Sequence, residues 1–314
     1  MIITCNKCST RYNISDGAIK KDVFSAKCAK CRNVFSVKKS ELVNNNVRQN
    51  TGPVEIEDIS SSEANKSARI ITICNQKGGV AKTTTCLNLG VSLSLLQKRV
   101  LLVDFDIQAN LTLLMGYKDA RSFFDLISTD DGNVSKFILK TKLDVWLLPS
   151  NSKMTLLSKK HLQQDNFELL LKESLSKVSN YFDYIIIDTP PSGDFYTLNA
   201  LMASDIAIIP TPCDYLSMQG VSHIVNMIDV IAKKSGHIID YKIPVTMFDS
   251  SSTASSVILD KLKSEHGGHL FRTRIERDDN VRESQIVHTP TIFYSKESAA
   301  GQQYYELARE IAAM

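Results

Sequence analysis

The sequence predicts a doubly wound α/β domain with a mostly parallel sheet, preceded by a small module built around cysteines. From residue 69 onward, short and nearly continuous apolar runs alternate with stretches in which apolar residues recur every three or four positions. Such runs fit parallel strands that are covered on both faces, and their alternation with helices is typical of α/β domains. The cysteine module is indicated by four of the seven cysteines, which lie within the first 31 residues.

The predicted elements follow one another along the chain without internal repeats. Strands are expected at residues 69–74, 100–104, 145–148, 184–188 and 206–210, because these runs are short, apolar and rich in β-branched residues. Helices are expected at residues 83–97 and 167–178, where apolar positions repeat with helical spacing.

Composition divides the chain into three parts, which we take as a module (residues 1–39), a linker (40–68) and the α/β domain (69–314). The module carries nine Lys or Arg and two Asp, or +7, whereas the linker carries two basic and five acidic residues, or −3. The linker is rich in Asn, Ser and Glu and too poor in apolar residues to form a core, so it is expected to be flexible. The α/β domain, with 26 basic and 27 acidic residues, is nearly neutral.

Targeting signals are not expected. No apolar run reaches the length of about 18 residues that a membrane helix needs, and the first residues do not read as a signal peptide. The sequence therefore predicts a cytoplasmic protein.

A phosphate-binding loop is predicted between the first strand and the first helix of the α/β domain. Residues 75–85 read NQKGGVAKTTT and precede an apolar-periodic helix. In this context backbone N–H groups and the helix N-terminus converge on phosphate oxygens. Lys82 would neutralise phosphate charge, and the Thr83 hydroxyl would bind Mg²⁺.

The loop departs from the common G-x-x-x-x-G-K-[ST] pattern at both glycines, which are replaced by Gln76 and Ala81. What remains, K-G-G-x-x-K-T-T, resembles the deviant Walker A motif of the ParA/MinD family. The resemblance implies that Lys77 reaches across a dimer interface to the partner's nucleotide. Alanine at position 81 is harmless only if its φ angle is negative. The ATP-binding set expected here is Lys77, Gly78, Gly79, Val80, Ala81, Lys82, Thr83 and Thr84.

Two further segments carry the same resemblance. VLLVDFDIQAN, residues 100–110, is similar to the family's switch I, which implies that Asp106 orients the attacking water while Asp104 supports the Mg²⁺ shell. DYIIIDTPPS, residues 183–192, is similar to Walker B and switch II, and there Asp188 would hold Mg²⁺ through water. The resemblance covers residues 69–314 and implies a dimerising ATP hydrolase in which Asp106, Lys77 and Lys82 are catalytic.

The cysteine spacing C-x2-C-x19-C-x2-C suits a tetrahedral site with four thiolate ligands. In a cytosolic protein such pairs favour a metal over disulfides, and the surrounding segment resembles small bacterial zinc ribbons. A structural Zn²⁺ is therefore expected on Cys5, Cys8, Cys28 and Cys31, with an iron–sulfur cluster as the alternative. The remaining cysteines, Cys74, Cys86 and Cys213, are expected to be packing residues.

Several branches of the superfamily share such an ATP site. A MinD-type membrane regulator would end in a basic amphipathic helix, whereas this chain ends YELAREIAAM. A nitrogenase-like reductase would need a cysteine pair that binds a shared cluster. An amidating ligase related to cobyrinic acid synthesis would need a glutaminase extension, and a tyrosine kinase would need a tyrosine cluster. These features are not evident in the sequence, which leaves the ParA branch.

The ParA branch implies an ATP-bound homodimer that binds DNA without sequence preference, associates with the nucleoid and is stimulated by a ParB-like or other adaptor protein. The cargo would be a chromosome or plasmid, or alternatively a protein cargo such as a chemotaxis cluster, an organelle or a polar complex. No membrane partner is expected. Basic residues in the last third are the DNA-binding candidates, because such binding depends on phosphate contacts: Lys261, Lys263, Arg272, Arg274, Arg277, Arg282 and Lys296.

Overall fold

The structure is a computed structural model that describes residues 2–4, 11–13, 23–27, 31–38, 67–129 and 132–314. Contacts divide the chain into two compact units, Met1–Gly52 and Pro53–Met314. In the part of the chain that is described, none of the helices is long and apolar enough to cross a membrane.

The described residues of the N-terminal unit form two antiparallel strand pairs. Strand β1 (Ile2–Thr4) pairs with β2 (Arg11–Asn13), and β3 (Val23–Lys27) pairs with β4 (Val34–Lys38). Of the four predicted zinc ligands, Cys5, Cys8 and Cys28 lie outside the described residues. Cys31 is described and is half-buried, three residues before β4 begins. In sequence, the two cysteine pairs therefore fall in the connections within the two strand pairs.

The large unit is built on a nine-stranded sheet, in the order β11-β12-β10-β5-β9-β6-β8-β7, with β13 also pairing with β12. All pairs are parallel apart from the antiparallel pair of β7 and β8. The strands are β5 (Arg69–Ile73), β6 (Val100–Asp104), β7 (Leu139–Lys140), β8 (Trp146–Leu148), β9 (Tyr184–Asp188), β10 (Ile206–Ile208), β11 (Thr211–Pro212), β12 (Asp240–Phe248) and β13 (Leu270–Glu276).

The predicted fold class is confirmed. All five apolar runs expected to be strands are strands, and every residue of β6 and β9 is buried, as strands covered on both faces require. The sequence did not predict β7, β11, β12 and β13, which lie toward the two ends of the sheet. Strand β13 alternates between buried and more exposed positions, so it lacks the continuous apolar run that marks the central strands.

Helices cover both faces of the sheet. The longer ones are α1 (Lys82–Leu95), α6 (Phe195–Ala203), α7 (Tyr215–Ser235), α8 (Thr253–His266), α9 (Asp279–Ile286) and α11 (Ala299–Ala312). The shorter ones are α2 (Asn110–Leu114), α3 (Phe123–Ile127), α4 (Thr155–His161), α5 (Leu170–Ser176) and α10 (Thr291–Tyr294). The predicted helix at residues 83–97 is α1, and the one at 167–178 is a 3₁₀ turn followed by α5.

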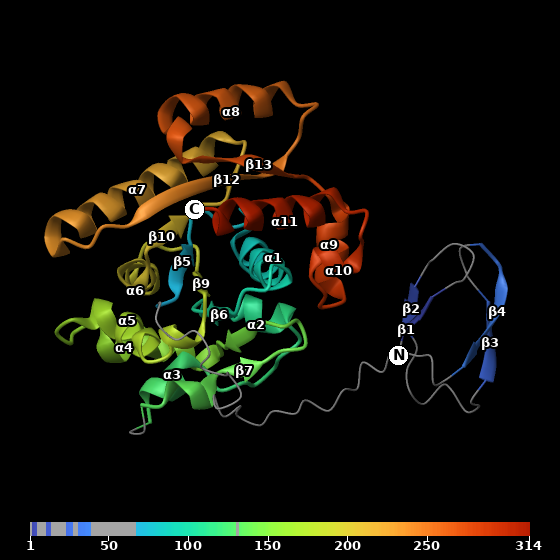
Figure 1. Cartoon of the computed structure of the whole chain (residues 1–314), viewed down its shortest axis with the longest axis horizontal. Coiled ribbons are helices and arrows are strands. Elements are labelled where there is room, and N and C mark those ends of the chain that lie inside the picture. The colour runs from blue at the N-terminus through green and yellow to red at the C-terminus, as the bar shows by residue number, and fades with distance from the viewer. Residues whose placement is uncertain (1, 5–10, 14–22, 28–30, 39–66, 130–131) are drawn as a thin grey trace. The chain divides into compact units, whose positions relative to one another are not determined.

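Side chains of the central strands pack into two separate hydrophobic cores, one on each face of the sheet. Ile71 and Ile73 of β5 pack with α1 and α11, whereas Ile185 and Ile187 of β9 pack with the helices α3 to α6. This division follows from the strand period of two, which sends successive side chains to opposite faces. In Figure 1, α1 and α6 accordingly lie on opposite sides of β5 and β9.

The central strands β5, β9 and β6 end at the same edge of the sheet. Their register pairs Ile73 with Asp188 and Asp188 with Asp104, so the chain segments that follow these strands begin side by side. In open α/β sheets ligands bind outside this carboxyl edge. The fold therefore brings the three sequence motifs to one place.

Candidate nucleotide-binding site

A cavity of about 500 Å³ lies at this edge of the sheet. Its phosphate-loop side consists of Gly78, Gly79, Ala81, Lys82, Thr83 and Thr84, and Asp106 lines it next to them. The loop joins β5 to the N-terminus of α1, so backbone N–H groups at the start of α1 face the same space. A chain geometry of this kind favours an anion such as a polyphosphate.

The backbone at Ala81 differs from the expectation. Its φ angle is +72°, in the left-handed region, where an alanine is disfavoured. Gly79 also has a positive φ, +75°. The left-handed turn at Ala81 starts α1, because the Ala81 carbonyl accepts a hydrogen bond from the Thr85 N–H at 2.8 Å. Alanine at this position therefore has a conformational energy cost, because the loop keeps a left-handed backbone that glycine would adopt more easily.

Lys82 is held inside the loop. Its side chain is buried, and its Nζ donates a hydrogen bond to the Lys77 carbonyl oxygen at 3.1 Å. Burial lowers the pKa of Lys82, while the nearby Asp188 and Asp106 act in the opposite direction. Because Lys82 lines the cavity and its ammonium is held at the loop, it is suited to bind an anionic ligand there.

Two carboxylates, Asp106 and Asp188, lie close to Lys82. Asp106 lines the cavity and accepts a hydrogen bond from the Gln108 N–H at 2.9 Å; burial raises its pKa. Asp188 is fully buried at the end of β9, and burial together with the charge of Asp104 raises its pKa well above the usual value. Nearby Thr83 acts in the opposite direction on this pKa, but both Asp188 side-chain oxygens are buried without a hydrogen-bond partner among the described residues.

The Asp104 carboxylate accepts hydrogen bonds from residues that follow it within a few positions in the chain. One oxygen accepts hydrogen bonds from the Thr112 N–H at 2.8 Å and the Thr112 hydroxyl at 2.6 Å, and the other accepts one from the Asp106 N–H at 3.2 Å. Burial raises its pKa to about 7, against the effect of the Thr112 bonds. Asp104 is not among the described residues that line the cavity. The structure thus places it behind Asp106, where it shapes the switch segment.

The donor set suits Mg²⁺. Thr83 supplies a hydroxyl, and Asp106 and Asp188 supply carboxylates whose raised pKa values reflect buried negative charge without enough compensation. Magnesium prefers such oxygen ligands and keeps several waters, so it does not need an all-protein cage. A cation beside Thr83 would offset the repulsion among the carboxylates.

The opposite wall of the cavity was not predicted from the sequence. It is formed by residues of β12, β13, α9 and α11 and the chain next to them, namely Thr246, Met247, Ile275, Glu276, Arg277, Asp278, Asp279, Val281, Arg282, Gln285 and Tyr304. Three hydrogen bonds connect this wall to the phosphate loop and α1, one of them between the Tyr304 and Thr85 hydroxyls at 3.2 Å. The Thr246 hydroxyl donates to the Val80 carbonyl at 3.2 Å, and Gln285 Nε2 donates to the Thr84 hydroxyl at 3.0 Å.

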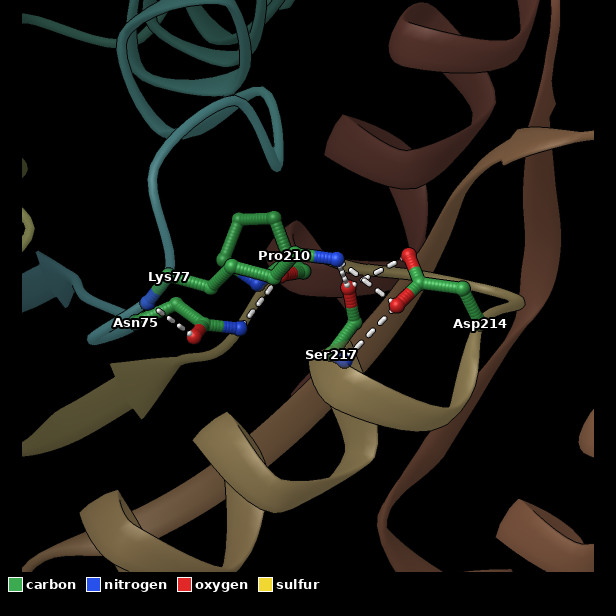
Figure 2. A network of polar contacts seen from close by, with 5 residues as sticks. All are labelled: Asn75, Lys77, Pro210, Asp214 and Ser217. Carbon is green, nitrogen blue, oxygen red and sulfur yellow. Dashed lines mark hydrogen bonds and ion pairs between the residues drawn. The ribbon is translucent and has the colours of Figure 1, made fainter.

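Lys77 is placed differently from its neighbours. It is not among the described residues that line the cavity, although Gly78 follows it directly. Its Nζ instead contacts Asp214 Oδ1 at 2.7 Å and the Ser217 hydroxyl at 3.2 Å, both from the start of α7 (Figure 2). Val80 is also predicted as a ligand contact, but its side chain is buried and only its carbonyl is engaged, by Thr246.

The predicted DNA-binding residues are all exposed, but they do not share one environment. Lys261 and Lys263 pair with acidic residues of their own helix, Arg272 approaches Glu310 at 3.7 Å, and Arg274 lies over the Phe248 ring. Arg277 and Arg282 line the nucleotide cavity instead, since α9 and the segment before it form its wall. Lys296 lies between α10 and α11. The run in sequence is therefore distributed over several sites by the fold.

The metal prediction is not resolved by the described residues, among which no group of three or more potential metal ligands occurs. Three of the four predicted zinc ligands lie outside this part of the chain. Cys74 and Cys86 are fully buried in apolar cores, in agreement with packing roles, and Cys213 is half-buried.

The chain is similar to known proteins over most of its length. A family model described as an AAA domain matches residues 68–241, more than half of the chain, and one described as a zinc-ribbon domain matches residues 1–36. Sporulation initiation inhibitor protein Soj of Bacillus subtilis is 34% identical over 250 residues, covering 78% of this chain and 98% of Soj. Chromosome partitioning protein ParA of Myxococcus xanthus is 34% identical over 249 residues, covering 77% and 87%.

A solved structure of similar fold is cobyrinic acid a,c-diamide synthase from Mycobacterium smegmatis with bound ATP analog and magnesium. It matches with a TM-score of 0.68 and 29% identity, over 78% of this chain and 94% of that one. The match over residues 68–241 and the identity to Soj and ParA along most of their length show that this chain belongs to the ParA/Soj family of P-loop ATPases.

Proposed function

We propose that this ATPase partitions or positions DNA, a chromosome or a plasmid, by forming an ATP-dependent dimer. The relatives named above are a sporulation inhibitor and a chromosome partitioning protein, which supports the partitioning role. The observation that carries the dimer is the position of Lys77. Lys77 belongs to the phosphate loop, but its side chain lies outside the cavity of its own chain and contacts Asp214, which supports a role for it at the nucleotide of a second chain.

Within one chain, ATP lies in the cavity with its phosphates at residues 78–84. Lys82 and the α1 N-terminus bind the phosphates, and the Thr83 hydroxyl and Asp188 hold Mg²⁺, with Asp188 acting through water. When bound, Mg²⁺ neutralises charge on the phosphates during transfer. The wall around Arg277, Arg282 and Gln285 then faces the ribose and the base.

Asp106 is the residue proposed to position the attacking water. It is the carboxylate that both lines the cavity and lies near Lys82, and burial raises its pKa, which makes it a stronger proton acceptor. Hydrolysis by a single chain is expected to be slow, because phosphoryl transfer depends on exact placement of charge and Lys77 is absent from the cavity of its own chain.

Dimerisation brings Lys77 of each chain to the nucleotide of the other. The surface around Lys77 is suited to a partner, because Tyr215 and Leu216 next to Asp214 are 58% and 65% exposed. The dimer then binds duplex DNA through exposed basic residues, of which Lys261, Lys263, Arg272, Arg274 and Lys296 remain candidates. A ParB-like or other adaptor stimulates hydrolysis, and the ATP-bound form associates with the nucleoid.

The N-terminal module is proposed to bind one structural Zn²⁺ through Cys5, Cys8, Cys28 and Cys31. The zinc-ribbon match over residues 1–36 and the four-cysteine spacing support this. Metal analysis of the purified protein should give about one zinc per chain, and Cys28→Ser should lose it. Iron together with a visible absorption band would show that the module holds a cluster instead.

A protein cargo is the second candidate, because four of the seven basic candidates have acidic or aromatic partners within the chain and are less available to DNA. A mobility-shift titration of the full chain with duplex DNA, run with ATP and with ADP across a salt series, separates the two. We use Asp106→Ala to accumulate the ATP state and Lys77→Ala as the monomeric control. DNA binding that needs ATP, needs Lys77 and weakens with salt supports partitioning of DNA. An ATP-dependent dimer that does not bind DNA indicates a protein cargo, and an Asp106→Ala chain that stays monomeric with ATP contradicts the proposed function.

A further inference from the structure

The segment that carries Asp106 is held by a residue from the neighbouring strand connection. Strand β8 pairs in parallel with β6, so both strands end at the same edge of the sheet. Ser150 lies two residues after the end of β8, and it is buried. Its hydroxyl donates a hydrogen bond to the Asp106 carbonyl oxygen at 2.6 Å, and its N–H donates to the Thr112 hydroxyl oxygen at 2.9 Å. Ser150 therefore contacts both ends of the segment 106–112.

These two hydrogen bonds complete a ring with Asp104. The Thr112 hydroxyl donates its own hydrogen to Asp104 Oδ2 at 2.6 Å, and the Thr112 N–H donates to the same oxygen at 2.8 Å. The other Asp104 oxygen accepts from the Asp106 N–H at 3.2 Å. The main chain of Asp106 is therefore fixed on both sides. Asp104 holds its N–H, while the Ser150 hydroxyl and the Ala109 N–H hold its carbonyl.

The residues around Ser150 are themselves fixed to another part of the domain. Asn151 donates through its side-chain Nδ2 to the Ala120 carbonyl oxygen at 2.8 Å and to Asp125 Oδ2 at 2.9 Å. Asp125 belongs to α3 and accepts a further hydrogen bond from the Ser122 N–H at 2.8 Å. Ser150 thus belongs to the framework of the domain, and it transmits the position of that framework to Asp106.

The position of Asp106 matters because its carboxylate lines the cavity. Ser150 and Thr112 are not among the described residues that do so. Misplacing a reacting group by about 1 Å can cost about 100-fold in rate. A buried hydroxyl that fixes the Asp106 main chain from outside the cavity can therefore affect turnover without touching the nucleotide.

We propose that Ser150 is a positioning residue for ATP hydrolysis, which holds the Asp106 main chain so that its carboxylate faces the attacking water. The inference rests on the role proposed above for Asp106 and adds the group that fixes it. Thr112 shares this role, because its hydroxyl connects Ser150 to Asp104. Both residues act on the rate of hydrolysis and leave the affinity for ATP unchanged.

Ser150→Ala tests the inference, because it removes the hydroxyl and leaves the N–H bond to Thr112 in place. In single-turnover reactions of the full chain with Mg·ATP, hydrolysis should slow by about tenfold, while the ATP affinity measured by calorimetry stays within about twofold of the parent's. Thr141→Val is the matched control, since Thr141 is also buried and its hydroxyl donates to the Val145 carbonyl at 2.7 Å. It should lower the urea midpoint of unfolding to a similar extent and leave the rate of hydrolysis unchanged.

A second pair of variants tests the ring at another position. Thr112→Val removes the hydroxyl with little change in shape and should slow hydrolysis as Ser150→Ala does. Thr112→Ser keeps the hydroxyl and should restore most of the rate. Because both hydrogen bonds belong to one network, the double variant Ser150→Ala, Thr112→Val should be only slightly slower than the slower single variant.

Hydrogen exchange gives a readout that does not depend on turnover. In the nucleotide-free chain, peptides covering residues 104–112 should exchange several-fold faster in Ser150→Ala than in the parent, and at the parent's rate in Thr141→Val. The inference is overturned if Ser150→Ala hydrolyses ATP at the parent's rate while Asp106→Ala is inactive, or if Thr112→Ser is as slow as Thr112→Val. Hydrolysis at the parent's rate by Asp106→Ala would instead contradict the role proposed for Asp106, and the inference with it.

Discussion

The two ends of the nucleotide cavity are built in different ways. The phosphate end is one continuous stretch, residues 78–84, and relies on backbone geometry and on the start of α1. The opposite wall is assembled from β12, β13, α9 and α11, which are far apart in sequence. Backbone that surrounds phosphates must adopt a particular turn, which requires certain residues at fixed spacing and therefore appears in the sequence as a motif. Side chains that meet only after folding produce no such motif.

The two ends also differ in electrostatics. At the phosphate end Lys82, Asp106 and Asp188 are buried, so each charge there acts with little screening. On the opposite wall Arg277 and Arg282 are exposed. Asp278 on the same wall is fixed by hydrogen bonds from the Asn280 N–H at 2.9 Å and the Ser298 hydroxyl at 2.6 Å. Substitutions at the phosphate end should therefore have much larger effects on nucleotide binding.

The largest effect is expected for Lys82→Ala. Removing a buried ammonium that faces the phosphates should cost about 3 kcal/mol, or about 100-fold in ATP affinity. Calorimetric titration of dilute, single chains with Mg·ATP measures this. Lys77→Ala, five residues earlier in the same loop, should bind ATP with unchanged affinity under these conditions, because Lys77 is not among the described residues lining the cavity. A similar loss in both variants would show that Lys77 serves its own nucleotide.

A smaller effect is expected on the opposite wall. Arg277→Ala and Arg282→Ala should each weaken ATP binding by at most about fivefold, because exposed charges contribute about 1 kcal/mol or less. The same titration measures it, with Arg272→Ala, which lies on β13 outside the cavity lining, as the control. If instead the two variants bind ATP normally and lose DNA affinity at saturating ATP, both arginines belong to the DNA surface.

The smallest effect is expected at Ala81. Because its φ is +72°, Ala81→Gly should relieve a backbone cost and stabilise the chain by up to about 1 kcal/mol, seen as a higher urea midpoint. Gly79→Ala should act in the opposite direction. A Cβ at Gly79 would meet no atom within 4 Å, so its effect reports backbone conformation alone. A lower midpoint for Ala81→Gly would mean that the entropy which glycine adds to the unfolded chain outweighs the strain.

The central part of the fold was predictable because burial on both faces demands long apolar runs. Strands β5, β6 and β9 show such runs and end in the phosphate loop, Asp104 and Asp188. Strand β13 escaped prediction for the same reason, because it is partly exposed and lacks a continuous apolar run. The missed strands β12 and β13 contribute Met247 and Ile275 to the cavity, so the wall they form was missed with them.

The sequence alone predicted the fold class, the loop with Lys82 and Thr83, and the two strand-end segments that contain Asp106 and Asp188, because each depends on residues adjacent in the chain. Only the tertiary structure decided where side chains from distant segments meet. It placed Arg277 and Arg282 at the nucleotide cavity, Asp104 behind Asp106, and Lys77 on Asp214, which is 137 positions away along the chain. Such contacts follow from strand order and helix packing, which bring together residues that no pattern in the sequence connects.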